Sequence, residues 1–289
     1  MIPITGHTQL TALLGSPVAH SISPLMHNEA FRLLDLDYTY LCFDVNENNL
    51  KTAVMGLKTC GIRGFNLTMP NKNKIVELLD QLSPAARLIG AVNTVVNDNG
   101  HLTGYNTDGV GYMQAVKDAG YDVIGKTITI MGAGGAATAI CAQAALDGVK
   151  RIHIFARKTS RFWGRTQNLV DNINSTLPCQ AILHENADKG ALAQAVSESA
   201  LLLNATSVGM APDTENTIIE NTSLYRPDLI VSDVIYNPRE TRFLREAREA
   251  GCRTFNGMYM LLYQGAEAFR LWTGKEMPVK EIKEKFFAH

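Results

Sequence analysis

The 289-residue sequence lacks several features that mark specialised classes of protein. It has almost no excess of charge, with 27 basic and 28 acidic residues and a formal net charge of −1, which argues against a nucleic-acid-binding surface. No apolar run approaches the roughly 20 residues that a membrane-spanning helix needs. The first ten residues lack the basic start and apolar core of a signal peptide, so we expect a cytoplasmic protein.

Cysteine is also scarce, with five residues at positions 42, 60, 141, 179 and 252. The number is odd and no two lie close together, which favours free thiols in a reducing cytosol over a disulfide framework. The seven histidines show none of the spacings typical of metal motifs, so we expect no metal site.

What the sequence does contain is a regular alternation of short apolar runs with helical patterns, which predicts an α/β fold. We expect two domains. The first, residues 1–107 with 257–289, would be a substrate-binding domain with a mixed sheet. The second, residues 108–256, would be a Rossmann-type, doubly wound dinucleotide-binding domain. The predicted strands are 10–15, 38–45, 63–69, 151–157, 201–206 and 229–236, with two further strands within 91–109 joined by the turn NDNG. Residues 126–148 are predicted to form a strand, a glycine turn and a helix.

Helix ends are predicted from capping residues. Ser23 is the expected N-cap of a helix over 21–34, with Pro24 at its first helical position, and Asn46 is the expected cap of a helix that stops at Gly61. Pro70 is expected to open a helix after the strand over 63–69. Further helices are predicted over 83–90, 240–252 and 258–272.

A glycine-rich turn, GAGGAA (132–137), follows a predicted strand and opens a helix, which is the context of a dinucleotide-binding motif. Gly132 would permit the tight turn, and Gly134 would let the backbone approach a pyrophosphate. The backbone of Ala133, Gly135 and Ala136 would complete the phosphate site at the helix N-terminus. The alternative is a tight turn with no ligand.

The next strand ends in Arg157 and Lys158, with no carboxylate. Sites that prefer NAD usually carry Asp or Glu here to bind the ribose hydroxyls, whereas cations suit the 2′-phosphate of NADP. We therefore predict NADP as the cofactor; a solvated basic loop is the alternative.

Lys72 is the candidate proton donor. At the start of the predicted helix its charged form is disfavoured, so it would release a proton readily. Asn66 and Thr68 share the polar face of the preceding strand, and Asp108 begins a helix where the chain enters the second domain. A lone lysine is more often solvated, and an aspartate is common at a helix start, so each has a structural alternative.

Eight ordered motifs make the chain resemble the shikimate dehydrogenases, including their shikimate/quinate branch. They are HSISP (20–24), NLTMPNK (66–72), GAVNT (90–94), YNTDGVG (105–111), GAGGAA (132–137), NATSVGM (204–210), DVIYNPRETRFL (233–244) and GMYMLLYQGAEAF (257–269).

The resemblance implies a role for each matched position. Lys72 and Asp108 match the catalytic pair. The serines that bind the substrate carboxylate match Ser21 and Ser23. The residues that bind the ring hydroxyls match Thr68, Asn93, Tyr236 and Gln264, and Asn66 matches a residue that supports the same strand face. On the cofactor side, the matched positions are Asn204, Thr206 and Gly257.

One segment departs from the family pattern. Many shikimate-specific members carry Asn-Arg-Thr after the second cofactor strand, whereas this chain has Ala-Arg-Lys-Thr followed by SRFWGR (160–165). The usual asparagine is missing, and so is the acid of the branch that accepts NAD. NADP remains the prediction, with NAD as a secondary cofactor.

The resemblance implies reversible, NADPH-dependent reduction of 3-dehydroshikimate to shikimate, with substrate bound between the domains. A quinate/shikimate dehydrogenase that uses either nucleotide is the nearest alternative. Methylenetetrahydrofolate dehydrogenase has a similar scaffold, but HSISP and Gln264 disfavour it. A non-catalytic nucleotide-binding module is disfavoured by the presence of Lys72 and Asp108. The sequence leaves monomer and homodimer open.

Overall fold

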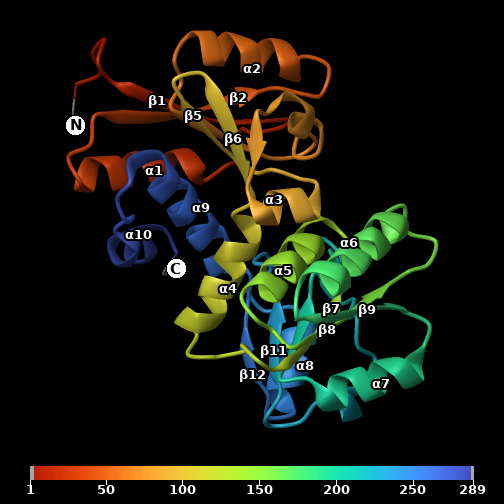
Figure 1. Cartoon of the computed structure of the whole chain (residues 1–289). Coiled ribbons are helices and arrows are strands. Elements are labelled where there is room, and N and C mark those ends of the chain that lie inside the picture. Colours follow the sequence, from red (N-terminus) through yellow and green to blue (C-terminus); the bar gives the residue numbers. More distant parts are fainter. Residues whose placement is uncertain (1–2, 288–289) are drawn as a thin grey trace. The chain divides into compact units, whose positions relative to one another are not determined.

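The computed structural model describes residues 3–287, and the chain divides into two compact units (Figure 1). Unit 1 comprises residues 1–111 and 262–289, and unit 2 comprises residues 112–261. The sequence predicts domain boundaries near residues 108 and 257. The boundaries between the two units lie a few residues further along, inside the helices α4 (Asp108–Asp118) and α9 (Met258–Thr273).

Unit 1 contains a six-stranded mixed sheet with the order β2-β1-β3-β5-β6-β4. Strand β1 pairs in parallel with β2 and β3, while β3–β5 and β5–β6 are antiparallel pairs, which confirms the mixed sheet predicted for this part of the chain. The strands are β1 (Gln9–Gly15), β2 (Tyr38–Asp44), β3 (Gly64–Leu67), β4 (Gln81–Leu82), β5 (Thr94–Asp98) and β6 (His101–Tyr105).

The predicted NDNG turn joins β5 to β6. Asn99 and Gly100 both have positive φ angles, 53° and 90°, as the two central residues of this type of hairpin turn require. The local sequence therefore fixes the register of the hairpin.

The helices of unit 1 are α1 (Ser23–Leu33), α2 (Leu50–Thr59), the 3₁₀ helix η1 (Lys74–Leu78), α3 (Pro84–Ile89) and α10 (Val279–Phe286), with parts of α4 and α9. Aromatic rings connect α1 and α9 to the sheet. Phe31 of α1 stacks on Phe269 of α9, with ring centroids 5.1 Å apart, and Trp272 Nε1 of α9 donates to the Val95 carbonyl oxygen at 3.0 Å. The second half of α9 is therefore fixed to β5 by a buried hydrogen bond.

Two predicted helix caps are wrong. The cap position of α1 is Ile22, without a side-chain cap, because Ser21 Oγ accepts the Ser23 backbone N–H in a local turn instead. The cap position of α2 is Asn49 rather than Asn46, because Asn49 Oδ1 accepts the Asn46 backbone N–H and turns the chain before the helix begins. Ser83, by contrast, caps α3 as its Ser-Pro sequence predicts.

The helix predicted to begin at Pro70 is also absent. Residues 69–73 form turns, and η1 begins only at Lys74. The backbone here is held by tertiary hydrogen bonds instead of a helical ladder. Asn71 Nδ2 donates to the Val45 carbonyl oxygen at 2.7 Å, and the Lys72 carbonyl oxygen accepts the Val92 N–H at 2.8 Å. The helix-terminus argument for Lys72 therefore does not apply.

Unit 2 contains a six-stranded, fully parallel sheet with the order β12-β11-β10-β7-β8-β9. Counted from β7, this is the 3-2-1-4-5-6 order of a dinucleotide-binding fold, with its switch point between β7 and β10. The predicted Rossmann-type fold is confirmed. The strands are β7 (Thr127–Met131), β8 (Arg151–Ala156), β9 (Gln180–Glu185), β10 (Leu201–Asn204), β11 (Ile230–Asp233) and β12 (Arg253–Phe255).

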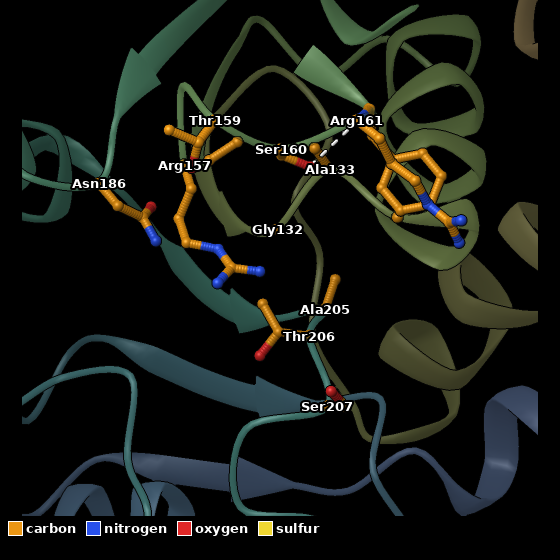
Figure 2. Close-up of a pocket in the computed structure, with 13 residues that line it drawn as sticks. Gly132, Ala133, Arg157, Thr159, Ser160, Arg161, Asn186, Ala205, Thr206 and Ser207 are labelled. Carbon is orange, nitrogen blue, oxygen red and sulfur yellow. Dashed lines mark hydrogen bonds between the residues drawn. The ribbon is translucent and has the colours of Figure 1, made fainter.

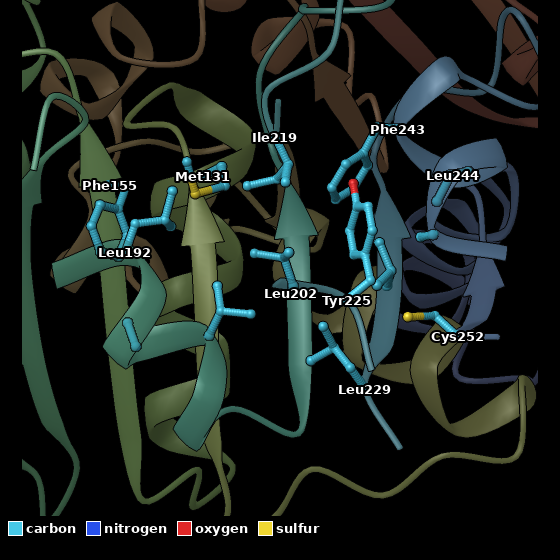
Figure 3. Packing of buried hydrophobic residues seen from close by; sticks show 14 residues of the cluster. Met131, Phe155, Leu192, Leu202, Ile219, Tyr225, Leu229, Phe243, Leu244 and Cys252 are labelled. Atoms are coloured by element: carbon cyan, nitrogen blue, oxygen red, sulfur yellow. The ribbon is translucent and has the colours of Figure 1, made fainter. Parts of the chain in front are cut away.

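The helices of unit 2 are α5 (Gly135–Leu146), α6 (Trp163–Thr176), α7 (Lys189–Glu198), the 3₁₀ helix η2 (Thr222–Leu224) and α8 (Arg242–Glu249). One face of the sheet carries a buried apolar cluster, in which Leu192 of α7 packs with Phe155 of β8 and Leu202 of β10 (Figure 3). Among residues 3–287 no helix is long and apolar enough to cross a membrane, and the five cysteines are free thiols.

Candidate active site

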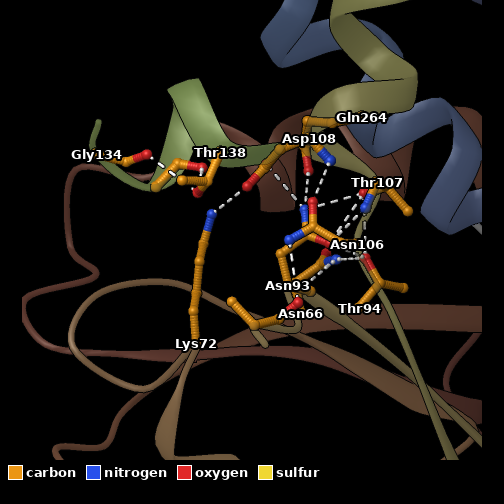
Figure 4. A network of polar contacts seen from close by, with 12 residues as sticks. Asn66, Lys72, Asn93, Thr94, Asn106, Thr107, Asp108, Gly134, Thr138 and Gln264 are labelled. Carbon is orange, nitrogen blue, oxygen red and sulfur yellow. Dashed lines mark hydrogen bonds and ion pairs between the residues drawn. The ribbon is translucent and has the colours of Figure 1, made fainter. Parts of the chain in front are cut away.

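Lys72 and Asp108 form an ion pair in unit 1, although 35 residues separate them in the chain. Lys72 Nζ lies 2.6 Å from Asp108 Oδ2, and both side chains are partly exposed (Figure 4). Asp108 is the first residue of α4, as predicted, where the helix dipole favours a carboxylate. The pair thus joins a turn after β3 to the start of a helix after β6.

The second oxygen of Asp108 is also engaged. Asp108 Oδ1 accepts a hydrogen bond from Asn93 Nδ2 at 2.9 Å, and the Asp108 backbone N–H donates to Asn106 Oδ1 at 3.2 Å. Because each carboxylate oxygen has its own donor, the plane of the carboxylate is fixed. The Lys72 ammonium is therefore held beside one defined oxygen of the carboxylate, Oδ2.

Asn93 is the centre of a buried polar network. Its Oδ1 accepts the Thr107 backbone N–H at 2.7 Å, and its Nδ2 also lies 3.5 Å from Gln264 Oε1 of α9. Asn66 contributes from β3, with Nδ2 donating to the Asn93 carbonyl oxygen at 3.1 Å and to Thr94 Oγ1 at 3.0 Å. Two strands and two helix segments therefore supply one connected set of side chains (Figure 4).

The other residues that the sequence assigns to the substrate in this unit are partly exposed. Ser21 and Ser23 lie at the start of α1, and Thr68 lies one residue beyond β3, where its backbone N–H donates to the Leu14 carbonyl oxygen. Asn66 differs from them because it is buried and both atoms of its amide are already engaged, Oδ1 by Tyr40 and Nδ2 by Asn93 and Thr94, which suits a supporting residue.

The sequence reasoning missed four members of this network: Tyr40, Thr94, Asn106 and Thr107. Tyr40 is fully buried on β2 and its hydroxyl donates to Asn66 Oδ1 at 2.8 Å. Burial raises the pKa of Tyr40 well above its usual value. Thr107 hydrogen-bonds Asn93 through both its backbone and its hydroxyl. Thr107 lies within the YNTDG motif and could have been found there, whereas a tyrosine in an apolar strand gives no such signal.

Unit 2 has a pocket of about 590 Å³ at the carboxyl ends of its central strands (Figure 2). Its lining comes from the turn after β7, the segment after β8, Asn186 after β9 and the residues after β10. The lining residues are Gly132, Ala133, Gly134, Ala156, Arg157, Thr159, Ser160, Arg161, Phe162, Asn186, Ala205, Thr206 and Ser207.

The residues of this pocket fit a dinucleotide. Gly132 has φ +120° and lies so close to the Ala205 carbonyl that a side chain would not fit, while a Cβ on Gly134 would meet no described atom within 4 Å. The open backbone at Gly134, before the start of α5, suits close approach by a pyrophosphate. Arg157 and Arg161 both line the pocket, and the Arg161 guanidinium lies over the Phe162 ring, 4.7 Å from its centroid; the sequence reasoning identified only Arg157.

Asn186 is a further lining residue that the sequence reasoning missed. Its Oδ1 is buried and has no hydrogen-bond partner within the described part of the chain. An unpaired buried acceptor is costly, and a nucleotide with donor groups is a suitable partner after a small side-chain movement.

Several predicted cofactor residues do not line this pocket. Lys158, Gly135 and Ala136 are absent from its lining, although Gly135 begins α5. Asn204 is buried, with Nδ2 donating to Asp233 Oδ2 at 3.1 Å and Oδ1 accepting the Thr206 hydroxyl at 2.7 Å, so it shapes the loop after β10.

The last two predicted residues also belong to unit 2. Gly257 has no room for a side chain beside the Val234 backbone. Tyr236 is an exposed residue, with 48% of its surface accessible.

Comparison with known proteins identifies the family of this chain. Residues 13–95 match the profile of the shikimate dehydrogenase substrate-binding domain, and residues 257–285 match that of the shikimate 5′-dehydrogenase C-terminal domain. A protein of Listeria monocytogenes (serotype 4b, strain F2365) named shikimate dehydrogenase (NADP(+)) is 55% identical over 284 residues, which cover 98% of this chain and 97% of the relative. The chain belongs to the shikimate dehydrogenase family.

Solved structures of shikimate dehydrogenases and of related enzymes are also similar to this chain. The crystal structure of shikimate 5-dehydrogenase from Listeria monocytogenes in complex with shikimate and NAD is 55% identical, with a TM-score of 0.95 and 97% coverage of each chain. Quinate dehydrogenase from Corynebacterium glutamicum in complex with NAD is 30% identical, with a TM-score of 0.86 over 98% of this chain and 99% of that one. Both the fold and the family predicted from the motifs are thus confirmed.

Proposed function

We propose that this protein is a shikimate dehydrogenase that interconverts 3-dehydroshikimate and shikimate with NADP(H). The observation that carries the proposal is the Lys72–Asp108 ion pair at 2.6 Å, because it places a proton-carrying group against a fixed carboxylate in unit 1. The 55% identity to a relative named as this enzyme supports the same reaction.

NADPH, when bound, supplies the hydride that reduces the ring ketone. Lys72 Nζ gives a proton to the oxygen that becomes the hydroxyl and recovers one from solvent, and in the oxidation direction it removes that proton. Asp108 holds the ammonium through Oδ2, while Asn93 prevents the carboxylate from rotating. The chain thereby orients one proton donor toward one reacting oxygen.

The substrate carboxylate is proposed to bind Ser21 and Ser23, whose side chains are partly exposed at the start of α1. Thr68 and Gln264 are proposed to bind ring hydroxyls together with Asn93. Gln264 is already adjacent to Asn93 in the network, at 3.5 Å. Tyr236 is proposed as a further ligand, to which its exposed phenol is suited. Asn66 is proposed to act only by supporting Asn93.

The nucleotide is proposed to bind the 590 Å³ pocket of unit 2, with its pyrophosphate against the backbone of residues 132–136. Arg157 and Arg161 would bind the 2′-phosphate of NADP through their planar, permanently charged groups. Lys158 lies outside the lining and would contribute only long-range charge. Thr206 lines the pocket on the β10 side, and Asn204 and Gly257 would shape its surroundings.

Dual use of NADP and NAD is a second candidate, which the NAD in the complex of the Listeria protein favours. A quinate-oxidising activity is supported by the likeness to a quinate dehydrogenase. Absorbance at 340 nm, followed with shikimate or quinate and with NADP or NAD, distinguishes these activities. We expect shikimate with NADP to give the highest kcat/KM. If no combination yields reduced nucleotide, the alternative of a non-catalytic nucleotide-binding module holds.

A further inference from the structure

Asn186 brings an amide group into the pocket of unit 2. It follows directly after β9 and lines the pocket together with the glycine turn after β7 and Arg157 after β8. Its Oδ1 is buried and has no hydrogen-bond partner within residues 3–287. In Figure 2 its side chain points toward the side chain of Arg157. The pocket therefore contains an acceptor that the protein alone leaves unused.

The position of this amide is set by the backbone around it. The Asn186 N–H donates to the Ala156 carbonyl oxygen at 2.9 Å, which connects this segment to the last residue of β8. Two residues later Asp188 caps α7, where its Oδ1 accepts the Ala191 N–H at 2.8 Å. Because hydrogen bonds hold both ends of this short segment, the Asn186 backbone stays in place and only its side-chain torsions remain free.

The order of the strands indicates which part of a dinucleotide reaches Asn186. In this fold the pyrophosphate binds at the turn after the first strand, here β7, and the adenosine ribose binds at the end of the second, here β8. The third strand, β9, is the next one in the sheet and pairs with β8 along its whole length. Adjacent strands lie about 4.8 Å apart, a distance that a purine ring system can span. A base attached to that ribose can thus reach the end of β9, where Asn186 lies.

The chemistry of an amide fits adenine better than it fits the ribose. The asparagine side chain presents an acceptor and a donor side by side, and adenine presents the complementary pair, its exocyclic N6 amine beside a ring nitrogen. Asparagine and adenine can therefore make two hydrogen bonds to each other. A ribose hydroxyl, by contrast, would bond to one atom of the amide and leave the other unused.

We propose that Asn186 recognises the adenine base of the nucleotide, with Oδ1 accepting from the N6 amine and Nδ2 donating to a ring nitrogen. This inference rests on the proposed function and deepens it, because it assigns the part of the pocket that binds the base. Arg157 distinguishes NADP from NAD at the ribose. Asn186 distinguishes adenine from other purines, whether or not the 2′-phosphate is present.

Nicotinamide hypoxanthine dinucleotide phosphate, which differs from NADP only in its base, is the probe for this recognition. Hypoxanthine carries an oxygen where adenine carries the N6 amine, so two acceptors would face each other at Asn186 Oδ1. We expect the wild type to bind this analogue about 5–100-fold more weakly than NADP, the range for loss of one amide–base pairing. Isothermal titration calorimetry gives both dissociation constants without catalysis.

Asn186→Leu removes both polar groups and keeps a side chain of similar size. NADP should then bind about 5–100-fold more weakly, while binding of the analogue changes little. The ratio of the two dissociation constants should therefore fall to within about threefold of one. Asn168→Leu is the matched control. Asn168 is an exposed asparagine of α6 outside the pocket lining, so its variant should keep the wild-type ratio.

A wild-type ratio within about threefold of one, or an Asn186→Leu variant that keeps the wild-type ratio, would overturn the inference. Equal weakening of both nucleotides by Asn186→Leu would also overturn it, because Asn186 would then act only through Arg157 or through the fold of its segment. If the wild type binds neither nucleotide, the nucleotide site of the proposed function is wrong, and the inference fails with it. If it prefers NADP to the analogue but oxidises no shikimate, the proposed reaction fails while recognition of adenine stands.

Discussion

The imidazole of His27 stacks on the phenol ring of Tyr40, with centroids 4.5 Å apart and ring planes 12° from parallel. His27 is fully buried, and neither ring nitrogen has a hydrogen-bond partner within residues 3–287. A protonated imidazole here would be an unpaired charge in an apolar cluster. Burial therefore lowers the pKa of His27 to about 3.

This histidine should make stability depend on pH. Its pKa is about 3 in the folded protein and about 6.5 in the unfolded chain, so the unfolded state binds the proton first as pH falls. The contribution to stability is complete above about pH 6.5 and is lost toward pH 3, by about 1.4 kcal/mol per pH unit.

His27→Phe tests this, because phenylalanine keeps a ring on Tyr40 and cannot titrate. Between about pH 7.5 and about pH 5, the wild type should lose about 2 kcal/mol more unfolding free energy than the variant. Urea unfolding at the two pH values measures both losses. Equal losses would show that His27 is hydrogen-bonded or solvated in the folded state.

Lys72→Ala should lower kcat by about 10²–10⁴-fold, the usual contribution of a general acid–base group. The dissociation constant of NADP should change little, because the proposed nucleotide site lies in the other unit. Lys74→Ala is the matched control. Lys74 lies two residues away and pairs with exposed Glu77 at 3.0 Å, outside the network. Steady-state kinetics and nucleotide fluorescence give the two readouts, and a kcat within tenfold of the wild type would remove Lys72 from the mechanism.

The sequence predicted best those features that are set by neighbouring residues. The Asn-Gly pair specifies the hairpin turn, the Ser83-Pro84 pair specifies the start of α3, and the glycines after β7 specify the cofactor turn. The position of Asp108 at a helix start was predictable for the same reason. The fold class then followed from the alternation of such local units.

The features that the sequence missed depend on partners far along the chain. Pro70 reads locally as a helix start, yet Asn71 and the Lys72 carbonyl bond to residues near 45 and 92 instead. Tyr40 resembles any strand tyrosine until Asn66 is placed beside it. The strands β9 and β12 were not predicted because Gln180–Glu185 has little apolar periodicity and Arg253–Phe255 has only three residues.

Arg157→Ala should weaken NADP binding by about 10–100-fold, since hydrogen bonds to charged groups contribute about 1.5–3 kcal/mol. NAD binding should fall much less, because NAD has no 2′-phosphate. Lys158→Ala is the control, since Lys158 is adjacent in sequence but outside the pocket lining. Dissociation constants of both nucleotides for both variants provide the comparison. An equal loss for NADP and NAD in Arg157→Ala would contradict the assignment of the phosphate site.

Gly64→Ala should destabilise unit 1. Gly64 begins β3, and a Cβ at this position would overlap Trp272 Nε1 and the Val95 carbonyl oxygen, the two groups that hydrogen-bond α9 to the sheet. Because a backbone group cannot move aside, the substitution should cost about 1–3 kcal/mol, the range for overpacked cores.

Gly56→Ala is the control for this change. Gly56 lies inside α2 with no described atom within 4 Å of an added Cβ, so alanine should add about 0.5–1 kcal/mol through its better helix propensity. Urea unfolding should therefore show midpoints shifted in opposite directions by the same chemical change. A Gly64→Ala midpoint at or above that of the wild type would mean that the contact between β3, β5 and Trp272 is looser than the structure has it.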